Sequence, residues 1–294
     1  MVAAPGEVIA ERFRLDQEIG RGERGVLFRA TDLATGIGRA VKALDPSVAQ
    51  GEDEARRIQV DSALLIDTGA TSFLPVLECL TDARGSVFVV TELLEAEPLD
   101  RHLGDIEEFG ERIRLAAALE LLGPVAETLG RAHGHGLVHG AVKPSNVLLV
   151  DPDSGGGVRL SDFFIARPPT IDVTTDPRVV LGSTAYLAPE VLAGARPDAR
   201  SDQYAFASVL FRLLAGHPPF PARSTLELFA LATQGPRPTI TASRTELHPA
   251  IDRWAAEALS VDPRRRYPTL PAMWRDFVGA LLKTQNAGLA RFRP

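Results

Sequence analysis

The pattern of apolar and polar positions changes near Pro98. Before this point, short runs of β-branched and apolar residues alternate with glycine-containing turns, which indicates strands. Residues 52–65 differ from these runs, because acidic residues at their start precede a longer helical pattern. We therefore expect a sheet with one helix, and strands that include residues 13–15, 26–30, 39–44 and 87–90.

After Pro98 the apolar positions follow helical spacing. Leucine and alanine recur on one face of residues 110–135, at Leu115, Leu119, Leu122, Ala126 and Leu129. Helices are also expected at 200–215 and 250–260, separated by proline-rich segments, and a hairpin turn at 151–157. The chain is thus expected to contain an N-terminal extension (1–12), a β-rich part (13–93), a helical part (94–282) and a C-terminal tail (283–294).

Composition and charge exclude several classes of function. The 294 residues carry a net charge of −6, so binding of nucleic acid through a basic surface is not expected. The sequence shows no basic and apolar leader and no run of about 18 apolar residues, so we expect neither a signal peptide nor membrane insertion. Cys79 is the single cysteine, which fits a reducing, cytoplasmic location and a buried structural role.

Lysine and asparagine are rare enough in this chain to be informative. Lysine and arginine total 32, yet Lys42, Lys143 and Lys283 are the only lysines, and Asn146 and Asn286 are the only asparagines. Arginine evidently serves wherever a plain positive charge is sufficient. A position that keeps lysine or asparagine therefore points to a specific contact.

A glycine motif precedes the first of these lysines. Gly20, Gly22 and Gly25 form the pattern G-x-G-x-x-G, which on its own is weak evidence, because dinucleotide-binding folds use the same pattern before a helix. Here residues 26–28 continue as a strand, and Lys42 ends the next strand-like run. This context favours a loop that covers nucleotide phosphates.

Residues 139–149, His-Gly-Ala-Val-Lys-Pro-Ser-Asn-Val-Leu-Leu, resemble the catalytic loop of protein kinases and the short strand after it. Asp162 and Phe163 fall where D-F-G is expected, residues 188–190 match A-P-E, and residues 201–204 match the start of the large central helix. Over residues 13–280 the ordered motifs resemble a bacterial serine/threonine protein kinase of the eukaryotic type. The resemblance implies an α+β fold with two lobes and an ion pair between Glu190 and Arg266.

The resemblance also implies a site for ATP and magnesium between the lobes. Asn146 and Asp162 would be the metal ligands, since oxygen donors suit this hard cation. Leu27 and Ala40 would lie above the adenine and Leu148 below it. The implied nucleotide-binding residues are Gly20, Gly22, Gly25, Leu27, Ala40, Lys42, Thr91, Glu92, Leu94, Lys143 and Leu148.

The sequence departs from the family pattern where the acceptor hydroxyl would be activated. Ala141 stands in place of the catalytic aspartate, and a methyl group cannot accept a proton. Gly140 replaces the arginine that docks a phosphorylated activation loop, and Phe164 replaces the glycine of D-F-G. Phosphorylation of the expected loop, at Thr170, Thr174 or Thr175, would need a different docking site.

Two further questions stay open at this level. The carboxylate that would pair with Lys42 is hard to place: Asp61 is the nearest candidate and Glu54 an alternative, both on the expected helix of residues 52–65, or this ion pair is absent. A metal cluster of His133, His135 and His139 is disfavoured, because the first two have the wrong spacing for one helical face.

These observations support three hypotheses. The first is a pseudokinase, without a catalytic residue of its own, that binds ATP and magnesium and acts as a switch or scaffold for a protein partner. The second is an interaction scaffold that binds no nucleotide. The third is a weak or redirected ATP-dependent transferase, because much of phosphoryl-transfer catalysis is positioning. A homodimer is compatible with each of them.

Overall fold

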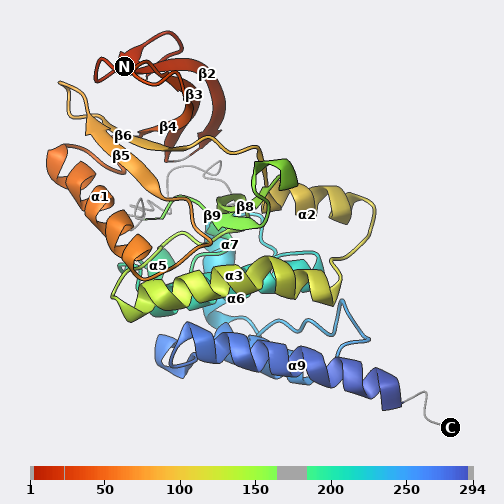
Figure 1. The fold of residues 1–294 in the computed structure, drawn as a ribbon. Coiled ribbons are helices and arrows are strands. Elements are labelled where there is room, and N and C mark those ends of the chain that lie inside the picture. The colour runs from red at the N-terminus through yellow and green to blue at the C-terminus, as the bar shows by residue number, and fades with distance from the viewer. Residues whose placement is uncertain (1–2, 23, 164–183, 291–294) are drawn as a thin grey trace.

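The computed structural model describes residues 3–22, 24–163 and 184–290, with side chains up to Thr284. The described chain has two lobes, and it crosses from the first to the second after Glu92 (Figure 1). The N-terminal lobe contains a curved sheet and one helix, and the C-terminal lobe is mainly helical. The change of pattern near Pro98 therefore marks the boundary between two architectures.

Six antiparallel strands form the sheet of the N-terminal lobe, in the order β1-β2-β3-β4-β6-β5. A second antiparallel sheet, β7-β8-β9, lies in the C-terminal lobe next to the crossing point. The strands are β1 (Val8–Ile9), β2 (Phe13–Gly22), β3 (Gly25–Asp32), β4 (Gly38–Leu44), β5 (Val76–Thr81), β6 (Val87–Glu92), β7 (Ala96–Pro98), β8 (Val147–Val150) and β9 (Val158–Leu160).

The four expected strands are present, as parts of β2, β3, β4 and β6. β1 lies within residues 1–12, so part of the expected extension pairs with the sheet. The expected hairpin turn joins β8 to β9 and contains a short 3-10 helix, Pro152–Ser154.

Alternation along β3 and β4 separates core residues from cavity residues. Val41 and Phe28 are fully buried in the apolar core on one face of the sheet. Their neighbours Ala40, Lys42 and Leu27 point to the other face and line a cavity between the lobes. Successive side chains of a strand point to opposite faces, so the same strand pairing places one set of side chains in the core and the other set in the cavity.

The helices are α1 (Glu52–Asp67), α2 (Leu99–Glu108), α3 (Leu115–Gly134), α5 (Pro189–Leu192), α6 (Ala199–Ala215), α7 (Thr225–Gln234), α8 (Ala250–Ala258) and α9 (Leu270–Ala290). The helices expected at 52–65, 110–135, 200–215 and 250–260 correspond to α1, α3, α6 and α8. The expectation of a tail from residue 283 was wrong for most of that segment, because α9 continues to Ala290.

Helix α6 runs through the middle of the C-terminal lobe (Figure 1). Nearly all of its residues are buried, which is typical of a helix at the centre of a large core. A reciprocal capping box between Asp198 and Ser201 starts it, and Gly216 in the left-handed region ends it. The helix is thus a fixed platform beneath the residues of the cavity.

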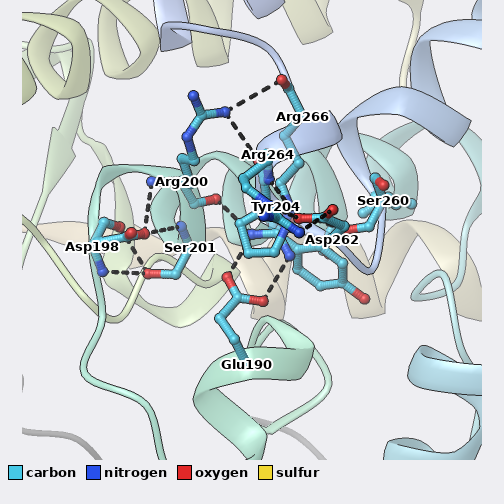
Figure 2. A network of polar contacts seen from close by, with 12 residues as sticks. Glu190, Asp198, Arg200, Ser201, Tyr204, Ser260, Asp262, Arg264 and Arg266 are labelled. Carbon is cyan, nitrogen blue, oxygen red and sulfur yellow. Dashed lines mark hydrogen bonds and ion pairs between the residues drawn. The ribbon is translucent and has the colours of Figure 1, made fainter.

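The ion pair expected between Glu190 and Arg266 is confirmed. Arg266 donates from Nη1 and Nη2 to the two carboxylate oxygens of Glu190, at 2.6 and 2.7 Å. The Arg266 side chain has no exposed surface, and its guanidinium lies 4.9 Å from the ring centroid of Tyr204. Figure 2 shows that this contact joins α5 to the segment before α9 across the start of α6. The pair braces the C-terminal lobe away from the cavity.

Candidate functional site

A cavity of about 400 Å³ lies between the two lobes. The strands β2, β3, β4 and β6 line it from the N-terminal lobe, and residues 143–148 and 161–163 line it from the C-terminal lobe. Every residue that the sequence predicted for nucleotide or metal lines this cavity: Gly20, Gly22, Gly25, Leu27, Ala40, Lys42, Thr91, Glu92, Leu94, Lys143, Asn146, Leu148 and Asp162. The fold therefore brings together residues that are up to 142 positions apart, from Gly20 to Asp162.

The glycine motif forms the hairpin between β2 and β3, where Gly22 pairs with Gly25. Gly25 is required by the backbone: its φ is +135°, and a Cβ there would lie 2.0 Å from the carbonyl oxygen of Ala43. A Cβ at Gly22 would meet nothing within 4 Å, and one at Gly20 would touch Leu27 at an ordinary 3.7 Å. Packing alone thus accounts for the third glycine and leaves the first two without a structural reason.

Lys42 and Asp162 form the central ion pair of the site. The Lys42 Nζ lies 2.6 and 2.5 Å from the two carboxylate oxygens, and both side chains are less than one-fifth exposed. Burial alone would raise the pKa of Asp162, but the charges of Lys42 and Arg24 outweigh it and hold that pKa below its usual value. Asp162 also has a φ of +59°, a region that aspartate tolerates better than most residues.

Of the alternatives left open for Lys42, the structure shows the one without an ion pair to Asp61 or Glu54. Both carboxylates belong to α1, and both contact Arg57 of the same helix, at 2.6 Å for Glu54 and 3.0 Å for Asp61. These are i,i+3 and i,i+4 neighbours, which face each other on a helix surface. A nearby arginine therefore engages both candidates, and Lys42 contacts a carboxylate from the other lobe.

The loop of residues 139–146 is held from beneath by α6. The Asp202 carboxylate accepts from the backbone N–H groups of His139 and Gly140, both at 2.8 Å, and lies 2.9 Å from Nε2 of His133. Asn146 donates from Nδ2 to the carbonyl oxygen of Ala141 at 2.9 Å. These contacts fix the backbone of the loop without using the side chain of residue 141.

His139 is a buried, neutral imidazole. Burial lowers its pKa to about 4. Its Nδ1 accepts from the backbone N–H of Ala141 at 3.1 Å, so the proton lies on Nε2, which donates to the carbonyl oxygen of Ser161 at 3.0 Å. The ring also packs edge-on against Phe163, with centroids 4.7 Å apart. His139 therefore ties the loop to the segment that carries Asp162.

In the described part of the chain, the histidines singled out by the sequence do not belong to a group of three or more His, Cys, Asp or Glu that could hold an ion. His133 contacts Asp202 and His135 contacts the backbone carbonyl of Arg131. Cys79 is half-buried, and burial raises the pKa of its thiol to about 12, so it is inert at neutral pH.

The donor set expected for magnesium does not fit a divalent cation in this arrangement. Asn146 uses its Nδ2 on Ala141, so its Oδ1 could serve as a ligand. Both oxygens of Asp162, however, are engaged by the ammonium group of Lys42. A metal ion and Lys42 would compete for the same carboxylate.

The sequence missed several cavity residues. Arg24 lies within the glycine motif and could have been noticed there, and Phe163 lies within the D-F-G position. Ile19, Leu74, Val76, Val89 and Leu93 are apolar residues with no sequence signal beyond ordinary core packing. Phe164, Thr170, Thr174 and Thr175, which the sequence singled out, lie outside the described residues. No helix in the described part of the chain is long and apolar enough to cross a bilayer.

Known proteins of similar sequence and structure identify the family of the chain. The chain is 31% identical to the probable serine/threonine-protein kinase PknB of Corynebacterium glutamicum over 296 residues, which covers 97% of this chain and 44% of the relative. It is 29% identical to the serine/threonine-protein kinase PknL of Mycobacterium tuberculosis, over 92% of this chain and 65% of the relative. The chain thus spans less than two thirds of the length of these relatives.

The fold agrees with these sequence matches. The crystal structure of the M. tuberculosis PknI kinase domain superposes with a TM-score of 0.71 and 26% identity, over 97% of this chain and all of that domain. The α+β, two-lobed fold expected from the sequence is therefore confirmed. The family profile described as the protein kinase domain matches residues 13–278, most of the chain. The chain belongs to the protein kinase domain family.

Proposed function

We propose that this chain is a catalytically impaired protein kinase homologue, a pseudokinase, that binds ATP and acts as a regulatory switch or scaffold for a protein partner. The observation that carries the proposal is Ala141. The loop around this residue keeps its contacts to Asp202 and Asn146, yet the side chain in the place of the catalytic carboxylate is a methyl group.

The described lining of the cavity offers few carboxylates that could replace the missing one. Of the described residues that line the cavity, only Glu92 and Asp162 are acidic. Glu92 ends β6 at the adenine end of the cavity, and Asp162 is engaged by Lys42. Loss of general-base assistance typically lowers a rate by about 10²–10⁴-fold. Transfer to a protein hydroxyl is therefore expected to be severely impaired.

The nucleotide part of the proposal is supported by what the cavity keeps. Two of the three lysines in the sequence, Lys42 and Lys143, line it. The lack of Cβ atoms at Gly20 and Gly22 has no packing reason, but it suits close approach of phosphate groups to the hairpin backbone. A nucleotide here would touch both lobes, so it would favour the closed arrangement that a partner could recognise.

A scaffold that binds no nucleotide is the second candidate, and one contact favours it. The ion pair between Lys42 and Asp162 already satisfies both of these charges without a ligand. Nucleotide binding would have to offset the loss or rearrangement of this pair. A weak ATP-dependent transferase remains the third candidate. It differs from the other two because it predicts measurable phosphate transfer.

The proposal is tested by calorimetric titration of the protein with ATP, with and without magnesium, repeated on Lys42→Ala. We expect binding in the wild type and a loss of about ten-fold or more in the variant, because a hydrogen bond to a charged group contributes about 1.5–3 kcal/mol. Phosphate transfer to a generic protein substrate is measured in parallel. Absence of binding would leave the scaffold, and robust transfer would favour the transferase.

A further inference from the structure

The phosphate end of the cavity carries more protein cations than the sequence motifs predicted. Arg24, at the tip of the β2–β3 hairpin, lines the cavity together with Lys42, Lys143 and Asp162. Arg24 is partly buried, and its Nη1 atom is fully buried. Its charge lies close enough to lower the pKa of both Asp162 and His139. Among the described residues at this end, Arg24, Lys42 and Lys143 are cationic and Asp162 is anionic.

The same geometry disfavours a metal ion on Asp162. An incoming divalent cation would have to displace the Lys42 ammonium, which contacts both carboxylate oxygens, and would lie in the field of Arg24. A displaced Lys42 would find no replacement on α1, because Glu54 and Asp61 are engaged with Arg57. An anionic phosphate group, in contrast, is attracted by every one of these cations.

We propose that the cavity takes a nucleoside phosphate without a divalent cation, and that Arg24 and Lys42 neutralise the phosphate charge that magnesium neutralises in metal-dependent sites. The proposal rests on the nucleotide binding proposed above, and it states that the nucleotide binds without a metal ion. Lys42 remains in contact with Asp162 and turns a free N–H toward the phosphates, and the guanidinium of Arg24 supplies paired donors. Arg24 is thus a phosphate-binding residue.

The test compares ATP titrations of the wild-type protein in EDTA and in excess magnesium by calorimetry. We expect dissociation constants that agree within about three-fold in the two buffers. Binding that requires magnesium would overturn the metal-free mode and leave the proposed nucleotide site intact. Failure to bind in either buffer would remove both proposals together.

Three variants locate the charges that matter. Arg24→Gln should weaken binding in EDTA by about ten-fold, since it removes a charged donor. Arg29→Gln is the matched control, because Arg29 is an exposed arginine of β3 that pairs with Glu95 outside the cavity, and it should leave affinity unchanged. Asp162→Asn should keep or increase affinity in EDTA, whereas a metal-dependent site would lose binding with this change. Thermal unfolding checks that each variant is folded.

An unchanged affinity of Arg24→Gln in EDTA would show that Arg24 is not a phosphate ligand and would overturn its role. A loss of binding in folded Asp162→Asn would show that the carboxylate holds a needed cation, and would overturn the metal-free mode. The effect of Arg24→Gln should also weaken as salt concentration rises, because ionic contacts to phosphate are screened.

Discussion

Glu190→Ala offers the sharpest test of how the C-terminal lobe is held together. The change removes the carboxylate that accepts two short hydrogen bonds from Arg266. Arg266 has no exposed side-chain surface, so its charge would remain buried, with the carbonyl oxygens of Ser260 and Arg200 and the ring of Tyr204 as partners. Removing one member of a buried ion pair typically costs about 3–5 kcal/mol.

The size of the expected effect can be measured directly. A loss of about 3 kcal/mol lowers the melting temperature of a domain of this size by roughly 6–12 °C. Urea unfolding followed by far-UV circular dichroism gives the free energy of unfolding. Arg264→Gln is the matched control, because Arg264 is 88% exposed and pairs with Asp262 at the surface, so little change is expected.

A double variant separates the ion pair from its surroundings. Glu190→Leu combined with Arg266→Met removes both charges, and replacement of a buried pair by apolar residues is often close to neutral. We therefore expect the double variant to be more stable than Glu190→Ala. A loss below about 1 kcal/mol in Glu190→Ala, or a double variant less stable than either single change, would refute the reasoning.

Three further predictions concern the cavity and its loop. Ala141→Asp should raise phosphate transfer by about ten-fold or more over the wild type if the missing carboxylate limits the reaction, and equal rates in a single-turnover assay would contradict this. Gly25→Ala should lower the free energy of unfolding by about 1–3 kcal/mol through backbone strain, whereas Gly22→Ala, where a Cβ meets nothing, should unfold like the wild type; urea unfolding distinguishes them. His139 has a pKa of about 4 in the folded chain, against about 6.5 when unfolded. The unfolded chain therefore binds more protons between these values, and stability should fall by up to roughly 3 kcal/mol as the pH is lowered from 6.5 to 4; a flat profile from urea unfolding across this range would show that His139 is not buried as a neutral ring.

The sequence named residues from both lobes that line the cavity, but it missed several of the helices. The motif residues are recognised by residue type and spacing, so many residues of the cavity lining could be named before the fold was known. Helices α2, α5, α7 and α9 were not predicted, whereas the nine-residue α8 was, so length alone does not decide which helices a sequence pattern indicates. Helix α9 continues through most of the segment expected as a tail, because Met273, Phe277 and Leu281 anchor it in the core and propagation of a helix is easier than its start.

The partner of Lys42 shows what a linear pattern cannot contain. Counting along the sequence placed Asp61 and Glu54 on an expected helix at 52–65, and both residues do lie on α1 (Glu52–Asp67). The sequence could not show that Arg57 contacts both carboxylates, because these contacts depend on which side chains face each other once the helix has packed. The contact between Lys42 and Asp162 joins residues 120 positions apart and requires the two lobes to be placed.

The anchoring of the loop by Asp202 separates the shape of the loop from its reactivity. All the contacts of residue 141 described above use its backbone, and the carboxylate that holds the neighbouring residues belongs to a helix in the core. A change of side chain at this position can therefore remove a proton acceptor at little expense to folding. In such an architecture, a single substitution can remove a catalytic group while the surface that binds a ligand keeps its shape. A surface of this kind can serve a function that requires binding without catalysis.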